Sequence, residues 1–399
     1  MNENAEQNRL RVLFLPAWYP SEVSPVGGPF IREHARAASL YNDVVVIHVY
    51  HSPGHRVKGL YNVSDAVEDG VRTIRIRYRC PSARGYSPIS RFLRLWSTFS
   101  YFRRFMRQGW RPDIIHAHVY SAAVPAVILG RAYGIPVVVT EHWTNFIMRE
   151  LTWERRLAAR FALNRAKAVL PVSEVLRQNL ELYGIRNDFR VVPNVVNTEL
   201  FYPSSLERRN DSKKHLLLVA IFAPRKGIPY LLEALNLVKK TRDDFVLDIV
   251  GDGPHRSEYE QMAAELGLQE NVVFHGRQPE VHSFMRNCDF FVMPSLYENF
   301  GVVYIEAMAS GKPVIASNIP GPNEFITKDV GILVPPKDVK ALAEAIDWML
   351  SHHRDYSPEK IASYARERFS QEVVGGKLDL IYRETARAPS KSNIPKKVR

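Results

Sequence analysis

Short runs rich in valine, isoleucine and leucine alternate with amphipathic stretches along almost the whole chain. Runs of this length are typical of strands buried on both faces of a sheet, and the amphipathic stretches predict helical crossovers between parallel strands. The first set of runs reads RVLFLP, VVVIHVY, DIIHAH, IPVVVTEH, AVLPVS and FRVVPN, and the second reads HLLLVA, FVLDIVG, VVFHG, FFVMPS, PVIAS and GILVPP. The chain is therefore expected to form two doubly wound α/β units of similar size.

A polar, charged and turn-rich stretch separates the two sets. We expect a first domain over 1–197, a linker over 198–214 and a second domain over 215–369. A final helix over 370–386 is expected to cross back to the first domain, and 387–399 form a polar tail. Ligands of doubly wound sheets bind beyond the carboxyl ends of the strands, so the cleft between the domains is the expected site.

The composition argues against several classes of protein. The 399 residues are 46% hydrophobic, which suffices for two cores. No window approaches the roughly 18 continuous apolar residues of a spanning helix, and the polar start MNENAEQNRL does not contain the apolar run of a secretory signal. Cys80 and Cys288 are far apart and form no metal-ligand pattern, so we expect reduced thiols and a cytoplasmic protein.

The net charge of +12 is concentrated in one segment, since residues 70–112 hold eleven arginines and no lysine, aspartate or glutamate. VRTIRIRYRC predicts a strand with one charged face, and SRFLRLWSTFSYFRRFMRQ predicts a helix. The expected apolar stripe of this helix consists of Phe92, Leu95, Trp96, Phe99, Phe102 and Met106. Either the stripe packs on the first sheet and the arginines face solvent, or the basic face binds nucleic acid, anionic lipid or an anionic substrate. No nucleic-acid-binding module accompanies the arginines, so nucleic acid is disfavoured.

The segment SLYENFGVVYIEAMASGKP follows a strand of the second domain. Glu298 falls in the loop, and Glu306 lies just over one turn into a helix that begins near Val302. The backbone N–H groups of Phe300, Gly301 and Val302 predict an anion site, which a phosphate can approach closely because Gly301 has no side chain. Carboxylates on either side of a diphosphate would bind hydroxyl groups, which favours a nucleotide sugar. The alternative is that both glutamates only stabilise the positive end of the helix.

The segment APRKGIPYLLEAL places Arg225 and Lys226 at the same strand-end surface. In isolation such a pair indicates a solvated turn, but beside a diphosphate site it supplies the charge that a departing nucleoside diphosphate needs. The chain contains no D-x-D pair for a divalent metal, so we expect no cofactor and metal-independent chemistry. Neither domain opens with G-x-G-x-x-G, which disfavours a dehydrogenase.

Together these motifs resemble family 4 of the retaining glycosyltransferases, whose GT-B fold has two facing Rossmann-like domains and an interdomain cleft. Glu298 and Glu306 match the family's E-x7-E signature, with NFG between them. The segment VPNVVNTELFYP is similar to the family's linker, with Val195 and Asn197 in place of a glycine and an aspartate. PRKG, VGDGP and YPSEVSPVGGPFIREHA match as well, so the resemblance covers nearly the whole chain.

The resemblance implies roles for individual residues. Glu298 would bind hydroxyl groups of the donor sugar, Glu306 the ribose, and His142 the transferred sugar. The catalytic set is Glu298, His142, Lys226 and Arg225. The donor-binding set is Gly27, Gly28, Asp252, Gly253, Arg277, Gln278, Glu280, Asn299, Phe300, Gly301, Val302 and Glu306.

Two of these assignments carry an alternative. The family often has an arginine five or six residues before Lys226, where this chain has Ile221 and Ala220, so the phosphate clamp is assigned to Arg225 and Lys226. Glu280 would accept hydrogen bonds from a guanine base, but an acid near a helix start needs no ligand to explain it.

The expected function is transfer of a hexose-type sugar, with retention, from a nucleoside-diphosphate sugar to a glycan or lipid-linked acceptor. Cell-envelope polysaccharide or glycolipid assembly is the expected setting. Segment 72–111 is expected to contact the anionic inner face of a membrane peripherally, without insertion. The alternatives are a hydrolysing epimerase, which would release free sugar, and a non-enzymatic binding protein.

Overall fold

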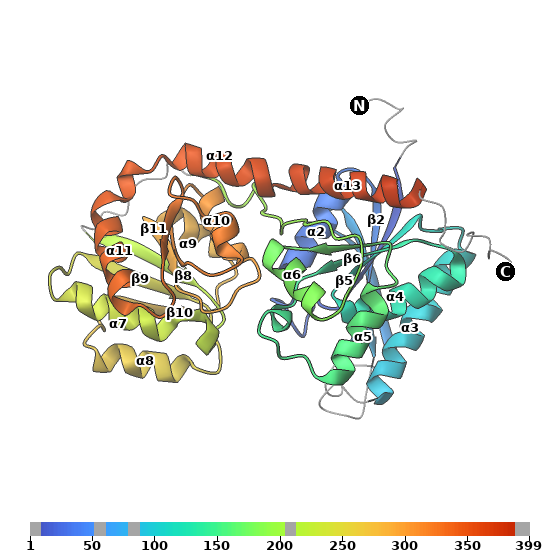
Figure 1. Ribbon diagram of the computed structural model, residues 1–399, viewed down its shortest axis with the longest axis horizontal. Helices are drawn as coiled ribbons and strands as arrows, with labels where there is room; N and C mark the ends of the chain where they lie inside the picture. Colours follow the sequence, from blue (N-terminus) through green and yellow to red (C-terminus); the bar gives the residue numbers. More distant parts are fainter. Residues whose placement is uncertain (1–8, 52–60, 79–87, 204–212, 388–399) are drawn as a thin grey trace. The chain divides into compact units, whose positions relative to one another are not determined.

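The computed structural model describes residues 9–51, 61–78, 88–203 and 213–387, and these form two compact units (Figure 1). Unit 1 contains the described residues up to Val172, Leu176–Val195 and the chain from Gln371 onward. Unit 2 contains Ser173–Val175 and Val196–Ser370. The two doubly wound α/β units expected from the sequence are confirmed.

Unit 1 is built on a seven-stranded sheet with the order β3-β4-β2-β1-β5-β6-β7. Its strands are β1 (Arg11–Pro16), β2 (Asp43–His51), β3 (Tyr61–Glu68), β4 (Val71–Tyr78), β5 (Ile114–His118), β6 (Val137–Glu141) and β7 (Ala168–Pro171). All neighbours are parallel except β3, which pairs antiparallel with β4. The central strands are buried on both faces because helices cover each side of the sheet.

The helices of this unit are α2 (Pro29–Ser39), α3 (Pro88–Arg107), α4 (Tyr120–Tyr133), α5 (Trp153–Leu163), α6 (Glu174–Leu182) and α13 (Gln371–Arg387). From β1 the chain moves to β2 on one side of the sheet order, and from β4 it moves through β5, β6 and β7 in the other direction. Right-handed crossovers therefore place α2 on one face of the sheet and α3, α4 and α5 on the other. Helix α4 packs against both α3 and α5, and α13 packs against α2.

The last helix, α13, packs into the hydrophobic core of unit 1 and forms hydrogen bonds with it. Leu378 and Tyr382 belong to the hydrophobic core of this unit. The Tyr382 hydroxyl lies 2.6 Å from Nδ1 of His116, and the Tyr41 hydroxyl donates to the Glu372 carbonyl at 3.1 Å. Helix α12 ends at Phe369, so the change of unit takes place at extended Ser370.

Unit 2 is built on a fully parallel six-stranded sheet with the order β10-β9-β8-β11-β12-β13. The strands are β8 (Lys214–Val219), β9 (Phe245–Val250), β10 (Val272–Gly276), β11 (Phe290–Met293), β12 (Val314–Ser317) and β13 (Gly331–Val334). The helices are α7 (Ile228–Lys239), α8 (Arg256–Glu265), α9 (Val281–Asn287), α10 (Val302–Ala309), α11 (Val339–His352) and α12 (Pro358–Phe369), with one-turn helices η2 (Pro224–Lys226), η3 (Pro322–Glu324) and η4 (His353–Asp355). The strand order reverses between β8 and β11, which makes this the topological switch point.

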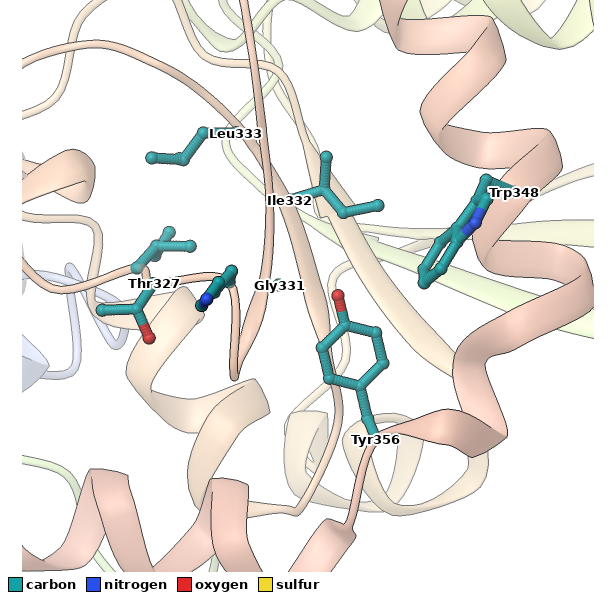
Figure 2. Close-up of a pocket in the computed structure, with 8 residues that line it drawn as sticks. Thr327, Gly331, Ile332, Leu333, Trp348 and Tyr356 are labelled. Carbon is teal, nitrogen blue, oxygen red and sulfur yellow. The ribbon is translucent and has the colours of Figure 1, made fainter.

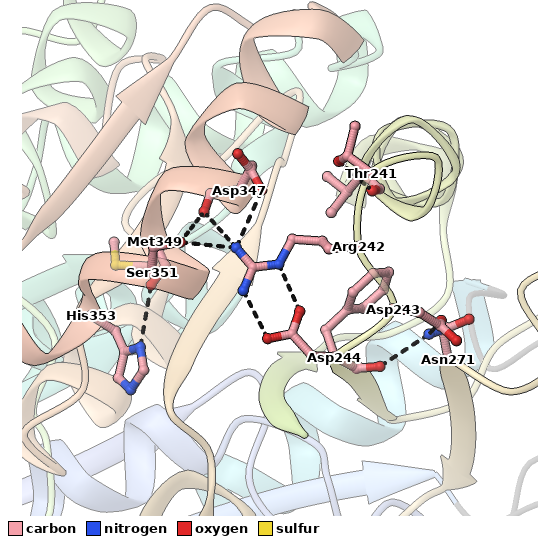
Figure 3. A network of polar contacts seen from close by, with 11 residues as sticks. Thr241, Arg242, Asp243, Asp244, Asn271, Asp347, Met349, Ser351 and His353 are labelled. Atoms are coloured by element: carbon pink, nitrogen blue, oxygen red, sulfur yellow. Dashed lines mark hydrogen bonds and ion pairs between the residues drawn. The ribbon is translucent and has the colours of Figure 1, made fainter. Parts of the chain in front are cut away.

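A polar network ties the turn after α7 to α11 (Figure 3). Arg242 holds Asp244 with two parallel hydrogen bonds of 2.7 and 2.8 Å. Its third nitrogen donates to the Ser351 hydroxyl at 2.9 Å and lies 3.3 Å from Asp347. Such bidentate pairs fix the orientation of both side chains, so the network holds the segment between α7 and β9 against α11.

Two expectations about the connections between elements differ from the structure. Residues 189–194 form no strand; Phe189 makes only an isolated bridge to Val169. The start of the predicted linker is packed on unit 2, where Phe201 is buried and Arg286 donates to the Leu200 carbonyl at 3.0 Å. The apolar ring of Phe201 accounts for its burial, and the hydrogen bond uses the backbone of Leu200.

The strand with one charged face that was predicted in the arginine-rich segment is β4, and acids from other segments balance the charges of its arginines. Arg72 forms two hydrogen bonds to Asp65 of β3, and Arg75 forms an ion pair with Glu68 of the same strand. Arg77 lies 2.9 Å from Glu22. The balancing acids come from segments outside the arginine-rich one, so its own composition did not reveal them.

The expected apolar stripe of α3 is also wrong in part. Phe102 is buried as predicted, but the second large buried ring is Phe105, while Phe92 and Trp96 are exposed. In its first eleven residues the helix buries three small polar residues: Ser90, Ser97 and Thr98. The Ser90 hydroxyl lies 2.7 Å from the Tyr78 hydroxyl, and the Thr98 hydroxyl donates to the Arg94 carbonyl at 2.8 Å, which makes the burial of these two groups tolerable.

Two further expectations concern thiols and membrane spans. Burial raises the pKa of Cys288 to about 12, so this thiol is protonated and unreactive, while Cys80 lies outside the described residues. Among the helices that the structure describes, none is both long and apolar enough to cross a membrane.

Gly375 and Gly376 are neighbours in α13 and offer a matched test of its docking. A Cβ on Gly375 would overlap the carbonyl group of Ala37 in α2, whereas one on Gly376 would come no closer than 3.8 Å to Tyr41. We expect Gly375→Ala to destabilise unit 1 by about 1–3 kcal/mol, because α13 must move away from α2.

Gly376→Ala is the control, and it should leave the thermal midpoint unchanged or raise it, since alanine is favoured over glycine in helices by about 1 kcal/mol. Differential scanning calorimetry measures both variants. Equal midpoints would show that the close approach at Gly375 does not hold the helix.

Candidate active site

The switch point of unit 2 brings together three predicted catalytic residues. The chain leaves β8 through η2, which carries Arg225 and Lys226, and it leaves the neighbouring strand β11 through the loop that carries Glu298. The Lys226 ammonium forms an ion pair with Oε1 of Glu298, and Nη1 of Arg225 lies 4.0 Å from the same oxygen. The sequence placed these residues at one strand-end surface, and the order of the sheet brings the two loops into direct contact.

The two loops are held against each other by backbone contacts. The Leu296 N–H donates to the Arg225 carbonyl at 2.7 Å. Gly227 has a φ of +70°, and a Cβ there would overlap the Pro294 carbonyl, so only glycine allows this approach. The Ser295 hydroxyl donates to Oε1 of Glu298 at 3.2 Å. Glu298 is thereby buried and held by both a cation and a hydroxyl group.

The start of α10 lies directly after this loop. Its N-cap residue is Gly301, with a φ of +84°, and no side chain caps the helix. A Cβ on Gly301 would overlap the ring of Tyr304. The sequence argument assigned this glycine to the approach of a phosphate, but its backbone angle and Tyr304 already require it. The first backbone N–H groups of α10 are nonetheless uncapped by side chains, as an anion site needs.

The remaining residues of the E-x7-E segment have distinct environments. Phe300 is buried against Phe325 and Phe369, with ring centroids 4.8 and 5.6 Å apart, and anchors the loop. Asn299 is buried, and Val302 is the first residue of α10. Glu306 lies in the second turn of the helix and is half-buried, where the sequence predicted it.

The loops after β9 and β10 hold the other predicted donor residues. Asp252 accepts a hydrogen bond from its neighbour Gly253 at 2.8 Å, and Nε of Arg277 lies 3.9 Å from Asp252. The Gln278 side chain donates to the His275 carbonyl at 2.8 Å. Glu280 is the exposed N-cap residue of α9, at the helix start as expected, and its side chain makes no cap bond.

Unit 1 contributes the other predicted residues, at the carboxyl ends of its strands. Gly28 is the N-cap of α2, with a φ of +70°, and Gly27 donates its N–H to the Ser24 carbonyl at 3.0 Å. No side chain caps α2 either. His142 directly follows β6 and is buried, with its ring against Phe30 at 4.8 Å.

His142 belongs to a buried group of histidines that the sequence argument did not identify. Its Nε2 lies 3.0 Å from Nδ1 of His118 on β5, and the ring of His34 from α2 packs edge-on against both. Burial holds the pKa of His118 and His142 well below the ordinary range, and neighbouring histidines lower it further. Burial lowers the pKa of His34 to about 4. These imidazoles are therefore neutral near pH 7 and act as hydrogen-bonding groups without charge.

Glu141 was also missed by the sequence argument. Its carboxylate accepts three backbone N–H bonds, from Tyr120, His142 and Trp143, at 2.8 to 3.0 Å. Burial raises its pKa to about 7 in spite of these bonds. The segment TEHW could have indicated this role, because a charged residue at the end of a fully buried strand needs a hydrogen-bond or ion-pair partner.

Two other features bear on what the protein can bind. In the part of the chain that the structure describes, His34, His118 and His142 are the one grouping with metal-ligand spacing, and two of them already share a hydrogen bond. A largely apolar pocket of about 480 Å³ lies at the start of β13, lined by Ile332, Trp348 and Tyr356 among others (Figure 2). The strands are parallel, so this pocket lies at the opposite end of the sheet from Lys226 and Glu298 and contains none of the predicted site residues.

Comparisons with known proteins assign both units. The family described as "Glycosyl transferases group 1" matches residues 205–368, and "Glycosyltransferase Family 4" matches residues 54–200. Together the two matches cover most of the chain.

Individual relatives agree with this. A glycogen synthase of Mycobacterium tuberculosis is 26% identical over 389 residues, 91% of each chain. An alpha-monoglucosyldiacylglycerol synthase of Streptococcus pneumoniae is 27% identical, covering 67% of each chain.

Solved structures show the same fold. Sucrose-phosphate synthase from Thermosynechococcus elongatus superposes with a TM-score of 0.77 and 22% identity, covering 94% of this chain and 99% of that one. Anabaena Alr3699/HepE in complex with UDP and glucose superposes with a TM-score of 0.74 and 18% identity, covering 94% and 100%. The chain therefore has the GT-B fold. Its matches and relatives show that it is a glycosyltransferase, in which residues 205–368 match the group 1 family and residues 54–200 match family 4.

The buried histidines predict how stability depends on pH. The native state keeps them neutral, while the unfolded state takes up protons below the ordinary value of 6.5, so the free energy of unfolding should fall as pH falls through 6.5. For His34, whose native pKa is about 4, the loss between pH 7.5 and pH 5 is on the order of 2 kcal/mol. Glu141 opposes this between pH 7 and 4.5, because its raised native pKa favours the native state at lower pH.

Because several histidines oppose one glutamate, the free energy of unfolding should show a net decrease as pH falls. Thermal midpoints measured between pH 7.5 and 5, above the range where most carboxylates titrate, check this prediction. A midpoint that is constant or rises toward pH 5 would contradict it.

Proposed function

We propose that this glycosyltransferase moves a hexose-type sugar from a nucleoside-diphosphate sugar to an acceptor hydroxyl group, with retention at the anomeric carbon. The observation that carries the proposal is the ion pair of Lys226 with buried Glu298, beside the uncapped start of α10. A cation, a carboxylate and free helix amides at one strand-end surface suit a ligand that combines a diphosphate with hydroxyl groups.

In this proposal the charge of the leaving diphosphate is stabilised by Lys226, Arg225 and the first amides of α10. Glu298 binds hydroxyl groups of the sugar and also orients Lys226, with which it shares a charge-assisted contact. Glu306 binds the ribose, and neutral His142 of unit 1 contacts the transferred sugar. The leaving phosphate takes the acceptor proton, and no metal ion takes part.

Further donor contacts are proposed for Gly27 and Gly28 in unit 1 and for Asp252, Gly253 and Arg277 in unit 2. Gln278 and Glu280 would face the base. The exposed Glu280 carboxylate suits guanine N–H groups, whereas the Anabaena structure contains UDP. A donor panel must therefore include both bases.

The proposed acceptor is a glycan or a lipid-linked glycan of the cell envelope. A relative named for monoglucosyldiacylglycerol synthesis supports a lipid acceptor, and one named glycogen synthase supports a glucan. We also propose a peripheral contact between the arginine-rich segment 72–111 and an anionic inner membrane face. Arg79 and Arg84 of that segment lie outside the described residues.

The proposal is tested by nucleoside diphosphate release from a panel of nucleotide sugars, with and without glycan and glycolipid acceptors. Acceptor-dependent release together with a glycosylated product supports transfer. Release of free sugar from every donor, independent of any acceptor, would instead support a hydrolysing enzyme.

Lys226→Ala should lower kcat on the order of a hundredfold or more, because one preorganised charge at the leaving group is lost. Arg225→Ala should cost less, since the Arg225 guanidinium is farther from Glu298 and more exposed than the Lys226 ammonium. Lys340→Ala, an exposed lysine on α11, is the matched control for loss of a positive charge. Unchanged kcat in Lys226→Ala would remove Lys226 from the clamp.

Glu298→Gln and Glu306→Gln should separate sugar recognition from nucleotide recognition. Glu298→Gln removes the charge that balances Lys226, so use of the donor sugar should fall while the bare nucleoside diphosphate binds equally well or more tightly. Glu306→Gln should weaken both ligands, because its target is the ribose. Titration calorimetry with nucleoside diphosphate and with donor measures the difference, and identical patterns in both variants would contradict these roles.

A further inference from the structure

Helix α5 of unit 1 carries a line of exposed apolar side chains. Trp153 is 72% exposed, and Leu157 and Phe161 are exposed as well. Residues four apart lie on the same side of a helix, so the three form one stripe. The helix uses its other side, including Ala159 and Leu163, for packing in unit 1. The stripe therefore has no role in the core of this unit.

Unbalanced positive charge accompanies this stripe. Arg155, Arg156 and Arg160 are exposed on the same helix, and Glu154 is its one acid. In the described part of the chain no carboxylate is paired with these three arginines. The guanidinium groups of Arg155 and Arg156 lie over aromatic rings at 5.4 and 5.0 Å. This differs from β4, where the arginines are balanced by acids of neighbouring segments.

Helix α3 repeats the combination. Ile89, Phe92 and Trp96 are exposed along one side of its first half, with Phe92 at 64%. The same side continues into Arg103 and Arg107, which are exposed and have no carboxylate partner among the described residues. Apolar and basic residues thus follow one another along a single exposed line.

The two lines belong to the same surface of unit 1. Helices α3 and α5 lie on one face of the sheet, and α4 packs against both. Each helix runs back from the carboxyl end of a strand, so the first turns of both lie toward the edge that carries Gly28, His118 and His142. Exposed apolar residues therefore gather near the edge where the proposed function places the sugar.

We propose that this α3/α5 surface binds an anionic lipid bilayer, with the apolar side chains in the interfacial region and the arginines at the headgroups. Trp and aliphatic side chains flanked by Arg are the combination that binds such interfaces. This revises the expected contact without insertion, since the exposed rings of Trp96 and Trp153 would enter the interface.

A second copy of this chain fits the surface less well, because a two-fold contact would bring the unpaired arginines of both copies together. The inference rests on the proposed function, because it deepens the membrane contact proposed above for segment 72–111 and extends it to α5. Its consequence is to hold this edge of unit 1 near a lipid-linked acceptor. Lipid binding is measured without turnover, so its failure would remove the membrane contact and leave the proposed sugar transfer standing.

The experiment is flotation of the full-length protein with vesicles of phosphatidylcholine alone and with phosphatidylglycerol added. We expect binding to the anionic vesicles only. Arg156→Gln with Arg160→Gln should weaken it on the order of tenfold or more, since each arginine near an anionic surface contributes about fivefold. Trp153→Ser with Leu157→Ser should weaken it on a similar scale, and brominated lipid should quench tryptophan fluorescence less in this variant than in the parent.

Matched controls lie elsewhere on the molecule. Leu380→Ser changes an exposed leucine of α13, and Lys337→Gln with Lys340→Gln removes two exposed positive charges from unit 2; all should bind like the parent. Circular dichroism and nucleoside diphosphate binding verify that every variant is folded. Three results would overturn the proposal: no binding to either vesicle, equal effects of the control variants, or a dimer in solution that the Trp153/Leu157 change dissociates.

Discussion

The contact between Lys226 and Glu298 joins the two loops that leave neighbouring strands at the switch point of unit 2. Taking two charges out of water is costly, and either partner left alone would be an uncompensated charge. The structure offsets this cost with the Ser295 hydroxyl, with Arg225 nearby and with a backbone bond from Leu296 to Arg225. The start of α10 depends on the same loop, so the positions of the catalytic candidates and of the helix amides are set together.

The strand ends of the two units differ in their electrostatics. Unit 2 presents cations, which suit a charged diphosphate, and a carboxylate, which suits hydroxyl groups. Unit 1 presents histidines kept neutral by burial and a glutamate whose pKa burial raises to about 7. Neutral donors and acceptors suit hydroxyl groups, because they form hydrogen bonds without holding an anion strongly.

Much of the fold was predictable because buried parallel strands leave a strong local pattern. RVLFLP, DIIHAH and FFVMPS each contain a strand, and residues that follow the first and the last of them were site candidates. The misses have local reasons too. Strand β3 was overlooked because Tyr61–Glu68 is a mostly exposed edge strand with few apolar residues. The stripe of α3 was misplaced because Phe92 and Trp96 were assumed to be buried, whereas Ser90, Ser97 and Thr98 face inward.

The amino-acid sequence by itself determined the two α/β units, the position of Glu298 in a loop, Glu306 within a helix, and Arg225 and Lys226 at a strand end. These follow from periodicity, helix breakers and chain order, which are local properties. Tertiary structure alone decided which charges meet. Lys226 and Glu298 are 72 residues apart and pair because β8 and β11 are neighbours. His34, His118 and His142 are neutral because three separate elements bury them together. The positive charges of Arg72 and Arg75 are balanced by acids of β3, because β3 pairs with β4. Burial and partner choice depend on segments distant in sequence, so no local pattern can report them.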